Sequence, residues 1–421
     1  MRALVTVLIV FSVAPYLGAQ TNRIDLVRAD APELAHFGDF AIGVRTVAFT
    51  AAERPDVLNT LADGSIAYYD RSLTVEIWYP ATLDADQSPG GRYRSTTRNT
   101  AVEATLFGSA VRDADVASAA EAFPLVIISH GYPGNRYLLS HLGENLASKG
   151  YVVAAIDHRD STYTDQQAFA STLYNRAPDQ RFVIDRIARM AAEPGSFLYR
   201  RVAAGSTAVV GFSMGGYGLL NNLGAGYNPA VVNLPIAPPN GLLAEHTTLN
   251  ESFRDNLDSR IRAGVAIAPW GMNNSMWRPE DLEGIRLPVL YVAGSVDTTA
   301  GYENGTRAIF KATRNSDRLL LTFENAGHSA GAPIPVPVEL LTAGDGVGVS
   351  HYIDPVWDTL RMNNIMDHFI TAFLDLHLRG DEDRRRFLQL PERSEAGWTG
   401  FTAGPAIGLR LEHLAPGQPD P

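Results

Sequence analysis

Short apolar runs alternate with helix-like segments through the middle of the chain, and this alternation constrains the fold more than any other feature. The runs are FPLVIISHG ending at Gly131, YVVAAIDH ending at His158, STAVVGFS ending at Ser213, GVAIAPWG ending at Gly271, LPVLYVAGSVD ending at Asp297 and LLLTFENAGH ending at His328. Continuous apolar strands are buried on both faces, which is typical of a mostly parallel sheet between layers of helices. The chain is therefore predicted to have an α/β fold with such a central sheet.

The segments on either side of these runs complete the predicted sheet and its helical cover. Two alternating segments, FAIGVRTVAF from Phe40 and SLTVEIWYPA from Ser72, predict antiparallel strands. The stretch 92–120 is polar and predicts a loop. The segment Met362–Leu378 has apolar residues at helical spacing, and Gly380 can end this helix.

Two proline-rich insertions interrupt the alternation, at 222–262 and 329–355, and either can form a cap over a site. The end of the chain, 396–421, is rich in Gly and Pro and predicts a peripheral tail. We expect a single catalytic domain at 20–395 that contains both insertions.

The first residues resemble a secretory leader. Met1 and Arg2 precede an apolar run from Ala3 to Val13, and small residues allow cleavage after Ala19, so residues 1–19 are predicted to be a signal peptide. A membrane anchor is the alternative, but this run is shorter than the roughly 20 residues that span a bilayer. The chain has no cysteine, which excludes a lipoprotein attachment site and disulfides. These features predict an exported protein, periplasmic or secreted, of bacterial type.

The charge balance limits the classes of partner. There are 46 acidic and 35 basic residues, a net charge of −11, which argues against a surface that binds nucleic acid. We expect a soluble protein that acts on neutral or cationic partners, without a stable membrane span.

The segment VVGFSMGGYG contains Gly-x-Ser-x-Gly between a predicted strand and a predicted helix. In that context the serine sits on a strained, exposed bend, whereas the same glycines elsewhere make an ordinary turn. We therefore predict that Ser213 is a nucleophile. The helix that starts after it leaves the Met214 backbone N–H free to bind an oxyanion.

A serine nucleophile needs a base and a group that orients the base. His328 follows the last predicted strand, and Asp297 ends the strand before it, so the order Ser213, Asp297, His328 is that of an α/β-hydrolase triad. Taken singly, Asp297 could be a helix cap and His328 a surface residue. His351 is the competing base, and Asp157 or Asp160 is the competing acid.

The turn SHGYPGNR predicts the second oxyanion donor, the backbone N–H of Tyr132. His130 in the same turn is expected to be a structural hydrogen-bonding residue. Tyr132 and Trp270 are candidate walls of the substrate pocket, although either could belong to the core.

Several of these segments, from VIISHGYPGNR and DHRDST to VVGFSMGGYG, GSVD and AGH, resemble α/β-hydrolases related to platelet-activating-factor acetylhydrolase and, more distantly, dienelactone hydrolase. The resemblance covers about Phe123 to Arg379 and implies that Ser213, Asp297 and His328 are catalytic. Asp157 stands where the acetylhydrolases often have glutamate, and Phe212 where histidine is commoner. The cysteine nucleophile of the dienelactone enzymes is absent.

The sequence thus predicts a serine hydrolase that cleaves a small-molecule or lipid-like carboxylic ester through an acyl-serine. This chemistry needs no metal or organic cofactor. Two alternatives remain: an amidase or peptidase with the same triad, and a non-catalytic binding protein on the same fold.

Overall fold

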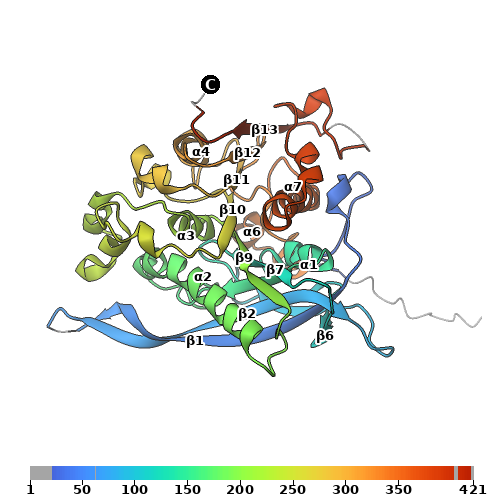
Figure 1. The fold of residues 1–421 in the computed structure, drawn as a ribbon, viewed down its shortest axis with the longest axis horizontal. Helices are drawn as coiled ribbons and strands as arrows, with labels where there is room; N and C mark the ends of the chain where they lie inside the picture. The colour runs from blue at the N-terminus through green and yellow to red at the C-terminus, as the bar shows by residue number, and fades with distance from the viewer. Residues whose placement is uncertain (1–20, 62, 403–405, 419–421) are drawn as a thin grey trace, which may run out of the picture.

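The computed structural model describes residues 21–61, 63–402 and 406–418, and the predicted leader at 1–19 lies outside them. Within this part of the chain the main sheet has 11 strands in the order β13-β12-β11-β10-β9-β7-β8-β2-β1-β5, with β6 paired to β2 (Figure 1). The inner strands β8, β7, β9, β10, β11 and β12 are parallel, as the apolar runs predict. No helix of the described residues is both long enough and apolar enough for a membrane span.

The strands and helices have the following bounds. The inner strands are β7 (Phe123–Ser129), β8 (Val152–Asp157), β9 (Val202–Phe212), β10 (Ile261–Ile267), β11 (Val289–Gly294) and β12 (Arg318–Phe323). The outer strands are β1 (Ala41–Thr60), β2 (Ile66–Thr82), β5 (Val111–Arg112), β6 (Asp115–Val116) and β13 (Leu409–Leu414). The helices are α1 (Ser140–Ser148), α2 (Phe169–Ala192), α3 (Met214–Asn222), α4 (Arg307–Ala312), α5 (Val338–Ala343), α6 (Gly346–Ser350) and α7 (Thr359–Arg379).

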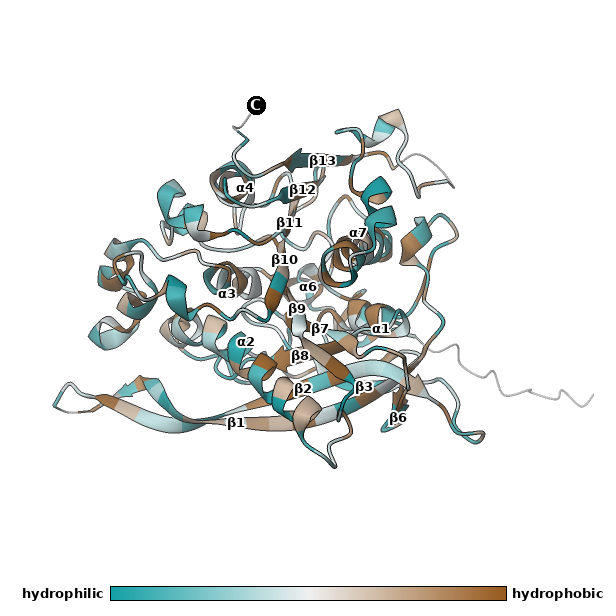
Figure 2. Ribbon diagram, in the orientation of Figure 1, coloured by the Kyte–Doolittle hydropathy of each residue, from teal (hydrophilic) through white to brown (hydrophobic). Residues whose placement is uncertain are grey.

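Helices cover both faces of the sheet, and the alternation of side chains along each strand fills two cores. In β7, Val126 and Ile128 belong to the core under α1 and α7, whereas Leu125 and Ile127 belong to the core under α2, α3 and α4. Figure 2 shows the hydrophobic residues gathered in the inner strands and in α7. Helix α7 contains the predicted helix and ends, as predicted, at Gly380, which has φ +70°.

The strand order reverses at β7, because the chain continues to β8 on one side of it and later to β9 on the other. In open α/β sheets ligands bind beyond the carboxyl ends of the strands at such a point. The turns after β7 and β9 meet there. A side-chain carbon added to Gly131 in the first turn would lie 3.3 Å from the Cβ of Ser213 in the second.

The outer segments differ from the sequence predictions. The stretch 92–120 was predicted to be a loop, but it contains a two-stranded sheet, β3 (Arg92–Thr96) and β4 (Glu103–Phe107), besides β5 and β6. These strands are short and half polar, so they lack the continuous apolar pattern of the inner strands. The region 396–421, expected to be a peripheral tail, supplies β13, which pairs antiparallel with β12 as the last strand of the main sheet.

The two insertions have little regular structure. Residues 222–262 contain the 3-10 helices η2 (Pro229–Asn233), η3 (Pro239–His246) and η4 (Arg254–Asn256) before β10 begins. Residues 329–355 contain the short helices α5 and α6.

Candidate active site

Ser213 occupies the sharp bend between β9 and α3. Its backbone has φ +53° and ψ −111°, a conformation that residues with a side chain rarely adopt. The Ser213 N–H donates to the carbonyl of Ile267 at 2.8 Å, and the Ser213 carbonyl accepts from the N–H groups of Tyr217 at 3.0 Å and Trp270 at 3.2 Å. These hydrogen bonds hold the strained residue between the end of β10 and the first turn of α3.

The glycines that flank Ser213 are required by close backbone approaches. A side chain at Gly211 would overlap the backbone of Gly215, and a side chain at Gly215 would overlap the carbonyl of Ser129 in β7. The Gly-x-Ser-x-Gly pattern therefore lets β9, α3 and β7 pack closely around the bend.

The structure brings the three predicted triad residues together. His328 Nε2 lies 3.1 Å from Ser213 Oγ, and His328 Nδ1 lies 2.8 Å from Asp297 Oδ2. Asp297 Oδ1 accepts from the backbone N–H groups of Thr299 at 2.7 Å and Ala300 at 3.1 Å, which fixes the orientation of the carboxylate. With the proton on Nδ1, the imidazole donates to Asp297 and accepts from the Ser213 hydroxyl.

The competing base and acids have other partners. His351 Nε2 lies 2.8 Å from the Tyr163 hydroxyl, and burial, followed by the charge of Arg98, lowers the pKa of His351 to about 4. Asp160 accepts from Arg71 at 2.8 Å. Asp157 receives the backbone N–H and the guanidinium of Arg136.

The two predicted oxyanion donors both lie beside Ser213. Met214 is the first residue of α3, so its N–H has no partner within the helix. Tyr132 follows Gly131 in the turn after β7, and no described residue accepts a hydrogen bond from the Tyr132 N–H. Both N–H groups therefore remain available for a ligand at Ser213.

A cavity of about 360 Å³ opens at Ser213 and His328. The predicted wall residues Tyr132 and Trp270 both line it, and the Phe169 ring lies between them, with ring centroids 5.0 Å from Tyr132 and 5.1 Å from Trp270. The other lining residues are Arg98, Gly131, Pro133, Phe212, Met214, Thr299, Ser329 and His351. The insertion 329–355 thus supplies part of the wall, and 222–262 supplies none of these residues.

Sequence reasoning missed Phe169 and Arg98, which line the cavity from the start of α2 and from the β3–β4 turn. It identified Phe212 only as a departure from the resembled family. The Phe212 ring lies 5.1 Å from the His328 ring, on which it packs.

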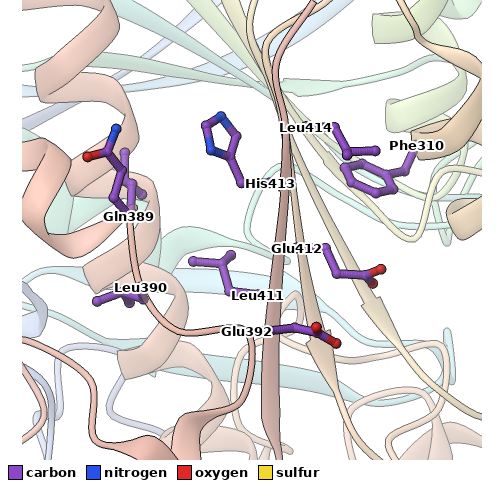
Figure 3. Close-up of a pocket in the computed structure, with 9 residues that line it drawn as sticks. Phe310, Gln389, Leu390, Glu392, Leu411, Glu412, His413 and Leu414 are labelled. Carbon is purple, nitrogen blue, oxygen red and sulfur yellow. The ribbon is translucent and has the colours of Figure 1, made fainter. Parts of the chain in front are cut away.

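A larger cavity of about 420 Å³ lies along β13 (Figure 3). Leu411 and His413 point to one side of the strand, and Glu412 and Leu414 to the other. The lining residues include no serine or threonine. Cavity size alone therefore does not identify the candidate active site.

His130, beside the candidate oxyanion turn, has a structural environment. It is buried, its Nδ1 lies 2.7 Å from the Gly131 carbonyl, and its Nε2 accepts from the backbone N–H of His158 at 3.2 Å. The fully buried guanidinium of Arg176 donates to the carbonyls of His130 and Gly131. The backbone N–H of His158, just after β8, and the Arg176 side chain of α2 thus fix the turn that follows β7.

A second Ser–His–Asp arrangement lies beneath this turn. Ser129 Oγ lies 2.8 Å from His158 Nε2, and His158 Nδ1 lies 3.0 Å from Asp179 Oδ2. Arg71 pairs with Asp179 at 2.9 Å. Burial alone would raise the pKa of Asp179, but the charge of Arg71 and the hydrogen bond from His158 outweigh it and hold this pKa below its usual value.

Comparison with known proteins finds similar sequences among esterases. A family model described as platelet-activating factor acetylhydrolase, isoform II, matches residues 92–193. Cutinase est1 of Thermobifida alba is 29% identical over 206 residues, which are 49% of this chain and 53% of the cutinase. Platelet-activating factor acetylhydrolase of Cavia porcellus is 44% identical over 61 residues, 14% of each chain.

The chain spans about half the length of the curated cutinases it matches. Among solved structures, ferulic acid esterase from Streptomyces cinnamoneus covers 85% of this chain and 94% of its own, with a TM-score of 0.54 and 22% identity. That likeness shows the fold. The chain has an α/β-hydrolase fold and is similar in sequence to platelet-activating factor acetylhydrolases and cutinases.

Proposed function

We propose that the chain is a serine hydrolase that cleaves carboxylic esters. The observation that carries the proposal is the chain of hydrogen bonds from Asp297 through His328 to Ser213, which ends in a cavity. A serine hydroxyl is a weak nucleophile at neutral pH, and a base held in the correct tautomer is what activates it. The matched cutinase and acetylhydrolases support an ester as the substrate.

In the proposed reaction His328 takes the proton of Ser213 as Oγ attacks the ester carbonyl. The carbonyl oxygen becomes an oxyanion between the N–H groups of Tyr132 and Met214. The alcohol leaves with the proton from His328, which forms an acyl-serine, and water then releases the acid by the same steps. Asp297 keeps the imidazole oriented and stabilises its positive charge.

The direct test is covalent labelling with a fluorophosphonate probe, followed by peptide mapping. The label is expected on Ser213, and Ser213→Ala is expected to lose both the label and at least roughly 10³-fold in ester turnover. The thermal midpoint should change little, because the substitution makes no cavity. A variant that kept activity within tenfold of the parent would contradict the assignment.

Two other functions are compatible with the fold. An amidase or peptidase would use the same triad, and matched activated amides and esters, assayed side by side, separate the two. A non-catalytic binding protein would bind ligands without taking the fluorophosphonate label.

We also propose that the protein is exported, on the sequence of residues 1–19 alone. Exported material is expected to begin near Gln20. Amino-terminal sequencing that found Met1 on exported protein would contradict this.

A further inference from the structure

One arginine side chain lines the cavity at Ser213, and no local sequence pattern singles it out. Arg98 lies in the turn between β3 and β4, far in sequence from the triad, and its residue is half-buried. No aspartate or glutamate is among the residues that line this cavity. Arg98 therefore brings a permanent positive charge into a cavity that no carboxylate lines.

Among the described residues, no carboxylate pairs with the Arg98 guanidinium. The hydrogen bond of Arg98 is made by its backbone N–H, which donates to the Tyr352 hydroxyl at 3.3 Å. Three groups whose pKa the Arg98 charge influences are neutral at neutral pH. Burial raises the pKa of Tyr163 and of Tyr352, and burial followed by the Arg98 charge lowers that of His351 to about 4. None of these three groups therefore carries a negative charge that would pair with Arg98.

The turn that carries Arg98 is held in place. Thr97 closes it, with its Oγ1 donating to the carbonyls of Asn99 and Val102 at 2.9 Å each. Asn135, from the turn that also contains Tyr132, donates to the Thr96 carbonyl at 2.9 Å. The hairpin is therefore tied to the same turn that supplies a candidate oxyanion donor, which fixes the backbone of Arg98 relative to that turn.

We propose that Arg98 binds an anionic group of the substrate, so that the site selects esters that carry a carboxylate or a phosphate. This inference rests on the proposed ester hydrolysis at Ser213. A guanidinium presents paired N–H donors that match the oxygens of either group. The net charge of −11 predicts neutral or cationic partners for the surface as a whole, whereas Arg98 sets a different preference inside the cavity.

The test compares esters that differ in charge. Para-acetoxybenzoate and para-acetoxybenzylphosphonate carry the anion on the leaving group, and para-acetoxybenzamide is their neutral reference. For an anion on the acyl group, the charged ester is para-nitrophenyl glutarate and its neutral reference is para-nitrophenyl pentanoate. The measured quantity is the ratio of kcat/KM for the charged ester to that for its neutral reference. The charged ester whose ratio falls most when Arg98 is replaced shows whether the preferred anion is a carboxylate or a phosphate-like group.

In Arg98→Gln this ratio is expected to fall at least about tenfold for one or more of the charged esters, the loss expected for a hydrogen-bonded ion pair. Arg98→Lys should retain part of the preference. Arg94→Gln is the matched control, because Arg94 lies on the same hairpin with its side chain 80% exposed and pairs with Glu103. A ratio that stays within twofold of the parent in Arg98→Gln, or falls equally in Arg94→Gln, would overturn the inference.

A measurement on the parent protein covers the case in which Arg98→Gln does not fold. Added salt should lower kcat/KM for the charged esters and not for the neutral ones, because ions screen the attraction. Equal effects of salt on kcat/KM for the charged and the neutral esters would overturn the inference. Ser213→Ala separates the proposed ester hydrolysis from the proposed role of Arg98. Hydrolysis that survives in Ser213→Ala refutes both proposals. Hydrolysis that depends on Ser213 but shows no preference that depends on Arg98 refutes only the role of Arg98.

Discussion

The molecule contains two Ser–His–Asp arrangements with almost the same hydrogen bonds. In the first, Ser213, His328 and Asp297 are joined at 3.1 and 2.8 Å. In the second, Ser129, His158 and Asp179 are joined at 2.8 and 3.0 Å. The two lie close together, because a side-chain carbon added to Gly215, two residues after the first serine, would lie 1.9 Å from the carbonyl of Ser129.

The surroundings of the two arrangements differ. The His328 side chain is 21% exposed and faces a cavity, whereas the His158 side chain is 1% exposed and that of Asp179 is 0% exposed. Asp179 is neutralised by Arg71, and Gln180 donates to Ser129 Oγ at 2.9 Å. Hydrogen-bond geometry alone therefore does not distinguish a reactive serine from a structural one. Access for a substrate and free oxyanion donors distinguish the two.

The largest effect is expected from Asp297→Asn. The amide keeps the shape but favours the wrong tautomer of His328, which should cost on the order of 10⁴-fold in turnover, with little change in thermal midpoint. Steady-state kinetics and thermal unfolding check this. The same change at Asp157 is the control. If Asp157→Asn lost turnover at unchanged stability while Asp297→Asn kept it, the acid would have to be reassigned.

In the buried arrangement, replacing the aspartate should lower stability strongly and turnover little. Asp179→Asn removes one of the two buried carboxylates that pair with Arg71 and leaves Asp160 as the other, so it should lower the free energy of unfolding by about 3 kcal/mol. Turnover per folded molecule should stay within about tenfold of the parent. Urea unfolding and active-site titration measure the two quantities.

Asp185→Asn is the matched control in the same helix, because Asp185 pairs with Arg189 at 2.9 Å near the surface and should cost at most about 1 kcal/mol. Equal losses of stability in Asp179→Asn and Asp185→Asn would refute the conclusion that the buried pair stabilises the fold more than the surface pair.

His158 makes the buried arrangement sensitive to acid. Burial, followed by the charge of Arg176, lowers its pKa from 6.5 to about 3, so between these values the unfolded chain binds a proton that the folded chain does not. Stability should therefore fall as the pH falls through this range. His158→Gln should reduce the slope by at most about 1.4 kcal/mol per pH unit. Urea unfolding at several pH values measures it, and an unchanged slope would exclude His158 as a source.

The smallest effect is expected from Ser129→Ala. It removes one buried hydrogen-bonded hydroxyl and should cost about 1 kcal/mol of stability. Turnover should remain close to that of the parent, because Ser129 takes no part in the proposed reaction. Fluorophosphonate labelling of Ser129 in the parent would show that the two arrangements are more alike than their burial indicates.

The sequence was sufficient for the inner part of the fold and for the positions of the candidate triad. Buried parallel strands are continuous apolar runs, and a hydrolase triad follows strand ends in a fixed order, so Ser213, Asp297 and His328 could each be placed by local pattern. The structure brings these three residues into hydrogen-bond contact. Helix α7 could also be predicted, because its apolar spacing and terminal glycine are local signals.

The missed features depend on contacts between distant parts of the chain. Arg71 and Asp179 are 108 residues apart, and no local pattern indicates that they form a buried pair. The β3–β4 hairpin is short and half polar, so its sequence predicts a loop and does not indicate the position of Arg98. Strand β13 was missed because it follows a Gly- and Pro-rich segment that suggests an unstructured end.

The strained backbone of Ser213 connects the proposed activity to the stability of the whole protein. A residue held at an unfavourable φ and ψ costs the folded state of order 1–3 kcal/mol, and glycine would relieve most of this cost. A laboratory selection for heat resistance alone would therefore favour Ser213→Gly, which removes the hydroxyl and relaxes the bend at once. At this position selection for thermostability and selection for turnover favour opposite residues.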